Sequence, residues 1–203
     1  MNKSLDSTWN NWFSRPNVDW AYVRINRTGS SWLVDYLTTN DFEKCNPREV
    51  RNDHKLIVLR EPLERFISGI CFYDELVNKF IAQPKQVLIR YENDPHICPQ
   101  VDFLKDVDVD NCTFIKYSPS WVSNLAQFLR DHNTSMHTSP STEWHNKPTF
   151  EDATDITLIN QNIKNRFILT ELYQEDPFMH KLINQHLEKD YKLYSKVKWY
   201  GTN

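Results

Sequence analysis

Two short segments of this chain carry side chains and backbone groups that suit an anion. The first is Arg27-Thr28-Gly29-Ser30-Ser31, in which a cation, a glycine and several hydroxyl groups follow one another. A β-prone run precedes it and apolar residues with helical spacing follow it, so the pattern predicts a loop between a strand and a helix. The first N–H groups of such a helix favour a phosphate or sulfate. An ordinary strand-to-helix turn capped by Ser30 explains the segment equally well by itself.

The second segment begins where the apolar run 54–59, which is typical of a buried parallel strand, comes to an end. Arg60 follows this run directly, and Pro62 suits the first turn of a helix. Further along that helix are Ser68 and Gly69, and the glycine would let the helix closely approach a neighbour or a ligand. Because both segments follow strands, a parallel sheet would bring Arg27 and Arg60 to one carboxyl edge, where ligands bind.

Histidines in irregular stretches are candidates for proton transfer. His96 lies within residues 88–100, a stretch that two prolines interrupt. His145 lies within residues 133–148, a polar stretch predicted to be a mobile loop that could cover a substrate. A lone loop histidine is usually only solvated, so the pattern by itself marks neither residue as catalytic. His54, at the entry end of its strand, is predicted to be structural or solvated.

The elements that would position these residues alternate between strands and helices. Short strands are predicted at 21–25, 54–59 and 113–117, each followed by residues with helical periodicity. Two later helices are predicted over 152–166 and 177–189, the second with Asp176 as its N-cap. This alternation predicts an α/β fold built on a parallel sheet with flanking helices.

The start of the chain is predicted to form an arm that packs on a single domain. Residues 1–19 are polar apart from Trp9, Trp12 and Phe13, whose spacing suggests one apolar edge of a short helix. No linker or internal repeat divides the rest, so one domain over residues 1–203 is expected.

Composition limits the classes of partner. The net charge is -3 at pH 7 with both signs interspersed, which argues against a nucleic-acid binder and makes any anion site local. No apolar run approaches the ~18 residues that cross a membrane, and no signal peptide is evident, so a soluble cytoplasmic protein without a membrane partner is expected. The four cysteines lack metal spacing, which predicts free thiols and no metal site. The oligomeric state stays open.

Together the two segments resemble the cofactor motifs of sulfotransferases that use 3′-phosphoadenosine 5′-phosphosulfate (PAPS), most of all the carbohydrate O-sulfotransferases. The 5′-phosphosulfate loop of that superfamily reads Lys-Thr-Gly-Thr-Thr or Arg-Ser-Gly-Ser-Ser, which residues 27–31 fit. Its 3′-phosphate element reads Arg-Asp-Pro, two or three further residues, then Arg and an apolar pair before Ser, and residues 60–69 match it with Glu61 in place of Asp. Looser likenesses follow in order at 96–100 (His-x-x-Pro-Gln) and 173–176 (Tyr-x-x-Asp).

The resemblance implies a P-loop-like fold and transfer of a sulfuryl group from PAPS to a hydroxyl acceptor, expected to be a carbohydrate, by in-line displacement without a metal. It implies that Arg27 stabilises the bridge oxygen as the bond breaks. It places Thr28, Gly29, Ser30 and Ser31 on the 5′-phosphate, and Arg60 and Ser68 on the 3′-phosphate. It also favours His96 as the general base, and His145 is the second candidate for that role.

Other classes of function remain as alternatives. A phosphate-binding ATPase or kinase would carry Gly-x-x-x-x-Gly-Lys-[Ser/Thr], and the sequence contains no such string. A non-catalytic relative that binds a nucleotide or a glycan would retain the same cofactor motifs. Only turnover separates that relative from an enzyme.

Overall fold

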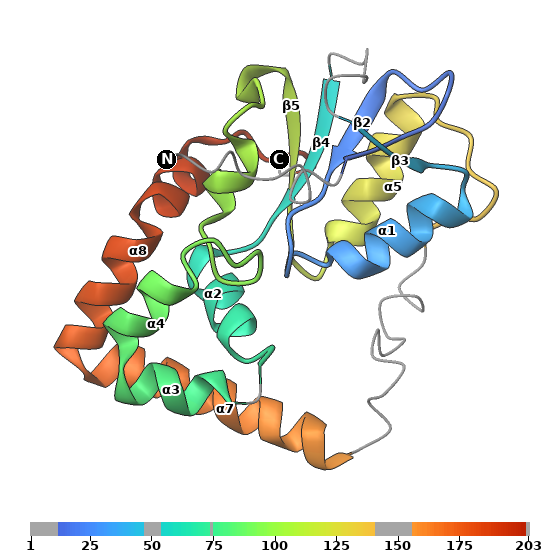
Figure 1. Ribbon diagram of the computed structural model, residues 1–203. Helices are drawn as coiled ribbons and strands as arrows, with labels where there is room; N and C mark the ends of the chain where they lie inside the picture. The colour runs from blue at the N-terminus through green and yellow to red at the C-terminus, as the bar shows by residue number, and fades with distance from the viewer. Residues whose placement is uncertain (1–11, 47–53, 74, 141–155, 202–203) are drawn as a thin grey trace. The chain divides into compact units, whose positions relative to one another are not determined.

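The computed structural model describes residues 12–46, 54–73, 75–140 and 156–201 (Figure 1). Contacts within the chain define two compact units, which we describe separately. The first unit comprises Met1–Arg60, Phe103–Lys147 and Val197–Asn203, and the second comprises Glu61–Asp102 and Pro148–Lys196. The single domain expected over residues 1–203 stays a prediction.

The first unit is built on a five-stranded sheet with the strand order β3-β1-β2-β4-β5 (Figure 1). The strands are β1 (Trp12–Ser14), β2 (Trp20–Val23), β3 (Glu43–Cys45), β4 (His54–Leu59) and β5 (Cys112–Lys116). β2, β4 and β5 are parallel, with Val23 beside Ile57 and Ile57 beside Phe114. β1 is antiparallel to both of its neighbours. The α/β class is therefore confirmed, whereas the all-parallel sheet is corrected to a mixed one.

The antiparallel half of the sheet corrects the helical spacing suggested for Trp12 and Phe13. Residues 1–11, including Trp9, lie outside the described residues, but Trp12 and Phe13 belong to β1 and not to a helix. The short connection from β1 to β2 turns at Asn17, which has φ 66°, and so short a connection requires antiparallel strands. Both aromatic side chains are buried, as suits their preference for strands.

Helices α1 (Ser30–Thr39) and α5 (Trp121–Asp131) complete the core of the first unit. The ring of Trp20 in β2 lies 5.1 Å from that of Phe128 in α5, and Trp32 in α1 lies 4.9 Å from Trp121, between ring centroids. His54 bonds Thr113 across the sheet at 2.7 Å, which gives it a structural partner at the entry end of β4. The first of these contacts joins α5 to the sheet, and the second joins α1 to α5.

The described part of the loop predicted over residues 133–148 makes several contacts within the first unit. Trp20 donates its indole N–H to Thr134 at 2.9 Å, and Tyr36 donates its hydroxyl to the carbonyl of Thr138 at 2.9 Å. The remainder of that loop, including His145, lies outside the described residues. Its predicted mobility is therefore not tested.

The second unit is helical. Its helices are α2 (Pro62–Ile70), α3 (Leu76–Ala82), α4 (Pro84–Arg90), α7 (Ile156–Glu175) and α8 (Pro177–Lys196). Glu61 caps α2 by accepting a hydrogen bond from the Glu64 N–H at 2.7 Å, and Asp176 caps α8 as predicted. The buried face of α2 packs against both α7 and α8 (Figure 1). No helix in the described part of the chain is both long and apolar enough to cross a membrane.

Candidate functional site

The predicted anion loop lies in the first unit, between the end of β2 and the start of α1. The buried Thr28 donates its hydroxyl to the carbonyl of Ile25 at 2.8 Å and so closes the turn from inside. Arg27 has φ 69°, and it is the one described non-glycine residue with positive φ that is not Asn or Asp. A left-handed arginine costs about 1–2 kcal/mol, a strain that is often found at functional sites.

Gly29 forms the N-cap of α1 and has φ 75°. A Cβ atom here would lie 2.6 Å from Cε2 of Tyr117, so only glycine fits without displacing that ring. The first helical bond runs from the Leu33 N–H to the Gly29 carbonyl at 3.1 Å, which leaves the preceding N–H groups without a partner inside the helix. Neither a side-chain cap nor an acidic residue occupies this end of α1, so Ser30 does not cap it.

Arg60 reaches this loop from the neighbouring strand. It follows β4, and its Nη1 lies 3.5 Å from the carbonyl oxygen of Arg27. Its guanidinium also lies 5.2 Å from the ring centroid of Tyr117, which follows β5. The carboxyl ends of three adjacent parallel strands therefore supply the loop, Arg60 and Tyr117. The predicted juxtaposition of Arg27 and Arg60 is confirmed. Tyr117 was missed, although its position after the third predicted strand placed it at the same edge.

Ser68 belongs to the second unit and is almost fully buried. Its hydroxyl accepts a hydrogen bond at 3.0 Å from Nη2 of Arg166 in α7. Asn162 orients this arginine by accepting from its Nε at 3.0 Å, and donates to the Cys71 carbonyl at 3.0 Å. Arg166 was missed by the sequence analysis because nothing local marks a helical arginine nearly a hundred residues from Ser68 as its partner.

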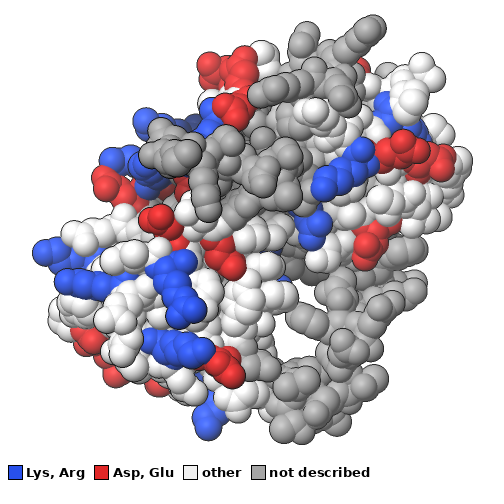
Figure 2. Space-filling view, in the orientation of Figure 1, with Lys and Arg blue, Asp and Glu red and all other residues white. Residues whose placement is uncertain are grey.

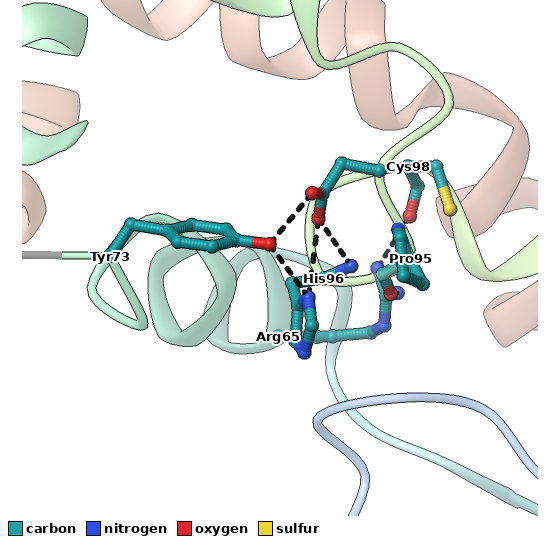
Figure 3. Close-up of polar contacts among 6 residues, drawn as sticks. Arg65, Tyr73, Pro95, His96 and Cys98 are labelled. Carbon is teal, nitrogen blue, oxygen red and sulfur yellow. Dashed lines mark hydrogen bonds and ion pairs between the residues drawn. The ribbon is translucent and has the colours of Figure 1, made fainter.

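The remaining residues of the second motif hold the segment that carries His96. Arg65 in α2 is fully buried and donates to the carbonyls of Cys98 at 2.6 Å and Pro95 at 3.0 Å (Figure 3). A Cβ atom on Gly69 would lie 1.9 Å from the carbonyl oxygen of His96. The backbone at His96 can therefore contact α2 only because residue 69 is a glycine. The close approach predicted for Gly69 is thus made to a neighbouring segment.

His96 itself is surrounded by polar and aromatic side chains of the same unit (Figure 3). Its Nδ1 lies 3.3 Å from Oδ1 of Asp94 and 3.2 Å from the hydroxyl of Tyr73. Its ring stacks on Phe72, with 4.2 Å between ring centroids. Burial alone would raise the pKa of Asp94, but hydrogen bonds from His96 and Tyr73 outweigh it and lower that pKa. An oriented imidazole beside an ionised carboxylate is suited to accepting a proton.

The structure therefore brings the predicted residues together in two groups. Arg27, Thr28, Gly29, Ser30, Ser31 and Arg60 share one edge of the sheet in the first unit. Ser68 and His96 lie in the second unit, on α2 and on the segment that α2 holds. Among the described residues, no cluster of histidine, cysteine or acidic side chains could hold a metal ion.

On the face that Figure 2 shows, charges of both signs lie among one another, as they do along the sequence. Lys and Arg lie beside Asp and Glu on this face. No protein-family model, curated protein or solved structure matches this chain.

Proposed function

We propose that this protein transfers a sulfuryl group from PAPS to a hydroxyl acceptor, expected to be a carbohydrate, by direct in-line displacement. The observation that carries the proposal is the meeting of the uncapped start of α1, Arg27 and Arg60 at the carboxyl ends of β2 and β4. Strand, loop and helix N-terminus in this order form a P-loop-like arrangement that suits a phosphate. The sequence motifs then favour PAPS over other phosphate esters.

In this proposal the start of α1 binds the 5′-phosphosulfate. The N–H groups before Leu33, together with the hydroxyls of Ser30 and Ser31, donate to its oxygens. Thr28 contributes by holding the loop, because its own hydroxyl hydrogen is used by Ile25. Arg27 supplies the positive charge that offsets the negative charge developing on the bridge oxygen during transfer.

Arg60 and Ser68 are assigned to the 3′-phosphate that distinguishes PAPS from other adenine nucleotides. The Ser68 hydroxyl accepts a hydrogen bond from the guanidinium of Arg166, which lies beside it in the same unit. Arg166 would then be a further cation for the same phosphate. A guanidinium and a hydroxyl together supply the charge-assisted hydrogen bonds that a phosphate dianion needs.

His96 is assigned as the general base that removes the proton from the attacking hydroxyl. Its ring is 21% exposed as a side chain, so a substrate can reach it, and the carboxylate of Asp94 lies beside it. General-base catalysis of this kind contributes ~10²–10⁴ in rate. Replacement of His96 by Ala should therefore lower kcat by about that factor and leave PAPS affinity intact.

Ligand binding tests the cofactor assignment. Thermal and urea unfolding are measured with PAPS, with its product 3′-phosphoadenosine 5′-phosphate (PAP), with AMP and with ATP. PAP at about 100 times its Kd should add ~2.7 kcal/mol to the free energy of unfolding, whereas AMP at the same concentration should add far less. Equal affinity for AMP and PAP would overturn the assignment of Arg60 and Ser68.

A matched pair of variants sharpens this test. Arg60→Ala should weaken PAP binding by about 1.5–3 kcal/mol, the value of a hydrogen bond to a charged group. Arg130→Ala removes an exposed arginine of the same unit, whose guanidinium donates to the side chain of Gln127, and should leave PAP binding unchanged. A similar loss in both variants would indicate a general electrostatic effect.

Turnover separates the remaining alternatives. Transfer of radiolabelled sulfate from PAPS to hydroxyl-bearing acceptors, with simple glycans tried first, would support the enzyme. Selective PAP binding without transfer to any acceptor would instead favour the non-catalytic relative. Preferential binding of ATP would favour a phosphotransferase, even though the sequence lacks the Gly-Lys-[Ser/Thr] string of that class.

A further inference from the structure

We infer that Asp94 and Tyr73 position His96 as the base, because they hold a hydrogen on Nδ1 and leave the lone pair on Nε2 to take the acceptor's proton. The inference rests on the proposed function for its catalytic consequence. Its structural content, the position of one hydrogen on one ring, stands on contacts within the second unit alone.

A count of the available hydrogens fixes the tautomer. The Tyr73 hydroxyl has one hydrogen, and its shortest contact is to Oδ2 of Asp94 at 2.7 Å, so the hydrogen is donated there. An ionised Asp94 has no hydrogen to give, and its Oδ1 lies 3.3 Å from Nδ1 of His96. Both polar neighbours of Nδ1 therefore offer it only oxygen lone pairs, and Nδ1 must be the donor.

The ionised state of Asp94 supports this count. Burial disfavours the charged carboxylate, yet hydrogen bonds from the His96 ring, the Tyr73 hydroxyl and the His96 backbone N–H leave its pKa below the usual value. The backbone bond to Oδ1 is 2.8 Å long. Because that bond also fixes the carboxylate to the segment it orients, Asp94 and the ring cannot move independently.

Aromatic contacts fix the plane of the ring. Phe72 stacks nearly parallel to it at 9°, while Tyr73 meets it edge-on at 85°. The described residues provide no hydrogen-bond partner for Nε2, so this atom is the one left for a substrate. Rotation of the ring would break both the stacking on Phe72 and the hydrogen bonds at Nδ1.

Proton transfer to Nε2 of His96 accompanies the transfer of the sulfuryl group. The acceptor O–H bond breaks as the Nε2–H bond forms, while the acceptor oxygen bonds to sulfur and the bond from sulfur to the bridge oxygen of PAPS breaks. The electron pair of that bond leaves with PAP. His96 becomes an imidazolium ion beside the Asp94 carboxylate, which stabilises it until the proton passes to solvent.

The variant Asp94→Asn tests the position of the hydrogen. An asparagine can still accept from the His96 backbone N–H, but its amide would donate to the Tyr73 oxygen and turn the tyrosine hydrogen toward Nδ1. The tautomer should therefore switch to Nε2–H. Nitrogen-proton NMR spectra of the whole protein labelled with ¹⁵N-histidine report this directly, and the His96 signals are assigned by their loss in His96→Gln.

Kinetics test the catalytic consequence. Asp94→Asn should lower kcat by about 10²-fold or more while the Kd for PAP changes less than about twofold, because the lone pair has left Nε2. The double variant Asp94→Asn/His96→Ala should be no slower than His96→Ala alone, since Asp94 acts only through the ring. Tyr73→Phe keeps the carboxylate and should retain the Nδ1–H tautomer. Glu92→Gln, an exposed neutralisation nearby, is the matched control.

The outcomes separate this inference from the proposed function. An Nε2–H tautomer in the native protein, or an unchanged tautomer in Asp94→Asn, would overturn the inference whatever the activity. A native Nδ1–H tautomer without PAPS-dependent transfer would uphold the positioning but refute the sulfotransferase. Additive losses in the double variant would show that Asp94 does not act through His96.

Discussion

Replacing Arg65 by methionine should destabilise the protein by loosening the segment that carries His96. Arg65 is fully buried, and it donates to the carbonyls of Cys98 at 2.6 Å and Pro95 at 3.0 Å. Methionine fills much of the same space, but it leaves both carbonyls without these donors. Hydrogen bonds to a charged group contribute roughly 1.5–3 kcal/mol each, so up to about 6 kcal/mol is at stake.

Two further effects adjust this figure. The positive charge of Arg65 counteracts the burial that raises the pKa of Asp190, so its loss leaves a buried carboxyl with less compensation. Against this, an apolar methionine avoids the cost of burying a guanidinium. We therefore expect the free energy of unfolding to fall by about 3–5 kcal/mol, a large share of the ~5–15 kcal/mol typical of a folded protein.

Urea unfolding followed by far-UV circular dichroism, which reports on the helices of the second unit, measures the loss, and amide hydrogen exchange locates it. Protection should fall most at Ile97 and Cys98, whose N–H groups bond the Asp94 carbonyl within this segment. A lysine at position 65 lacks the forked guanidinium that donates to both carbonyls, so Arg65→Lys should lose less stability than Arg65→Met. It can still be measured if the methionine variant does not fold. Arg90→Met, at an exposed arginine of the same unit, should change stability by less than ~0.5 kcal/mol.

A loss below about 1 kcal/mol in Arg65→Met would refute the reasoning, because it would show that the two carbonyls find other partners at little cost. Unchanged protection at Ile97 and Cys98 would refute it as well. In that case the segment would be held by Gly69 and its close contact with α2. Gly69→Ala would then be the damaging substitution.

Three other outcomes follow from the same structure. Gly29→Ala should cost about 2–4 kcal/mol in urea unfolding, from its left-handed φ and its clash with Tyr117, and should also weaken PAP binding. Burial lowers the pKa of His186 in the folded protein from its usual value of 6.5. At lower pH the unfolded chain therefore binds a proton more readily than the folded chain, and the free energy of unfolding should fall as the pH drops below about 6.5. His186→Gln should flatten that part of the pH profile. Arg27→Ala should lower kcat more than PAP affinity, and a change confined to KM would reduce Arg27 to a binding role.

The loop and the three parallel strands could be predicted because their signals are local. A continuous apolar run marks β4, and a glycine between hydroxyl residues marks the start of α1. The first strand could not be predicted in the same way. Trp12 and Phe13 are compatible with a helix edge over so short a span, and only pairing with Cys45 and Lys44, far along the chain, makes them a strand.

The contacts in the second unit could not be predicted from local sequence for a similar reason, because their partners are far apart in the chain. Arg65 belongs to a motif associated with a phosphate, yet its guanidinium is committed to backbone carbonyls some thirty residues away. Asp94, two residues before His96, was a sequence signal that could have been used, because a carboxylate at that spacing can bond the histidine. Tyr73 became evident only once α2 and the 94–98 segment were placed together.

The second motif gains a physical explanation that the resemblance alone does not offer. Arg65, Ser68 and Gly69 lie within roughly one turn of α2, so they project from one side of the same rigid helix. Ser68 meets Arg166 of α7, while Arg65 and Gly69 hold the backbone on either side of His96. One short helix therefore fixes both the hydroxyl assigned to the 3′-phosphate and the segment that carries the proposed base. A displacement of α2 that strained the contact between Ser68 and Arg166 would therefore also move the backbone beside His96, and the ring with it.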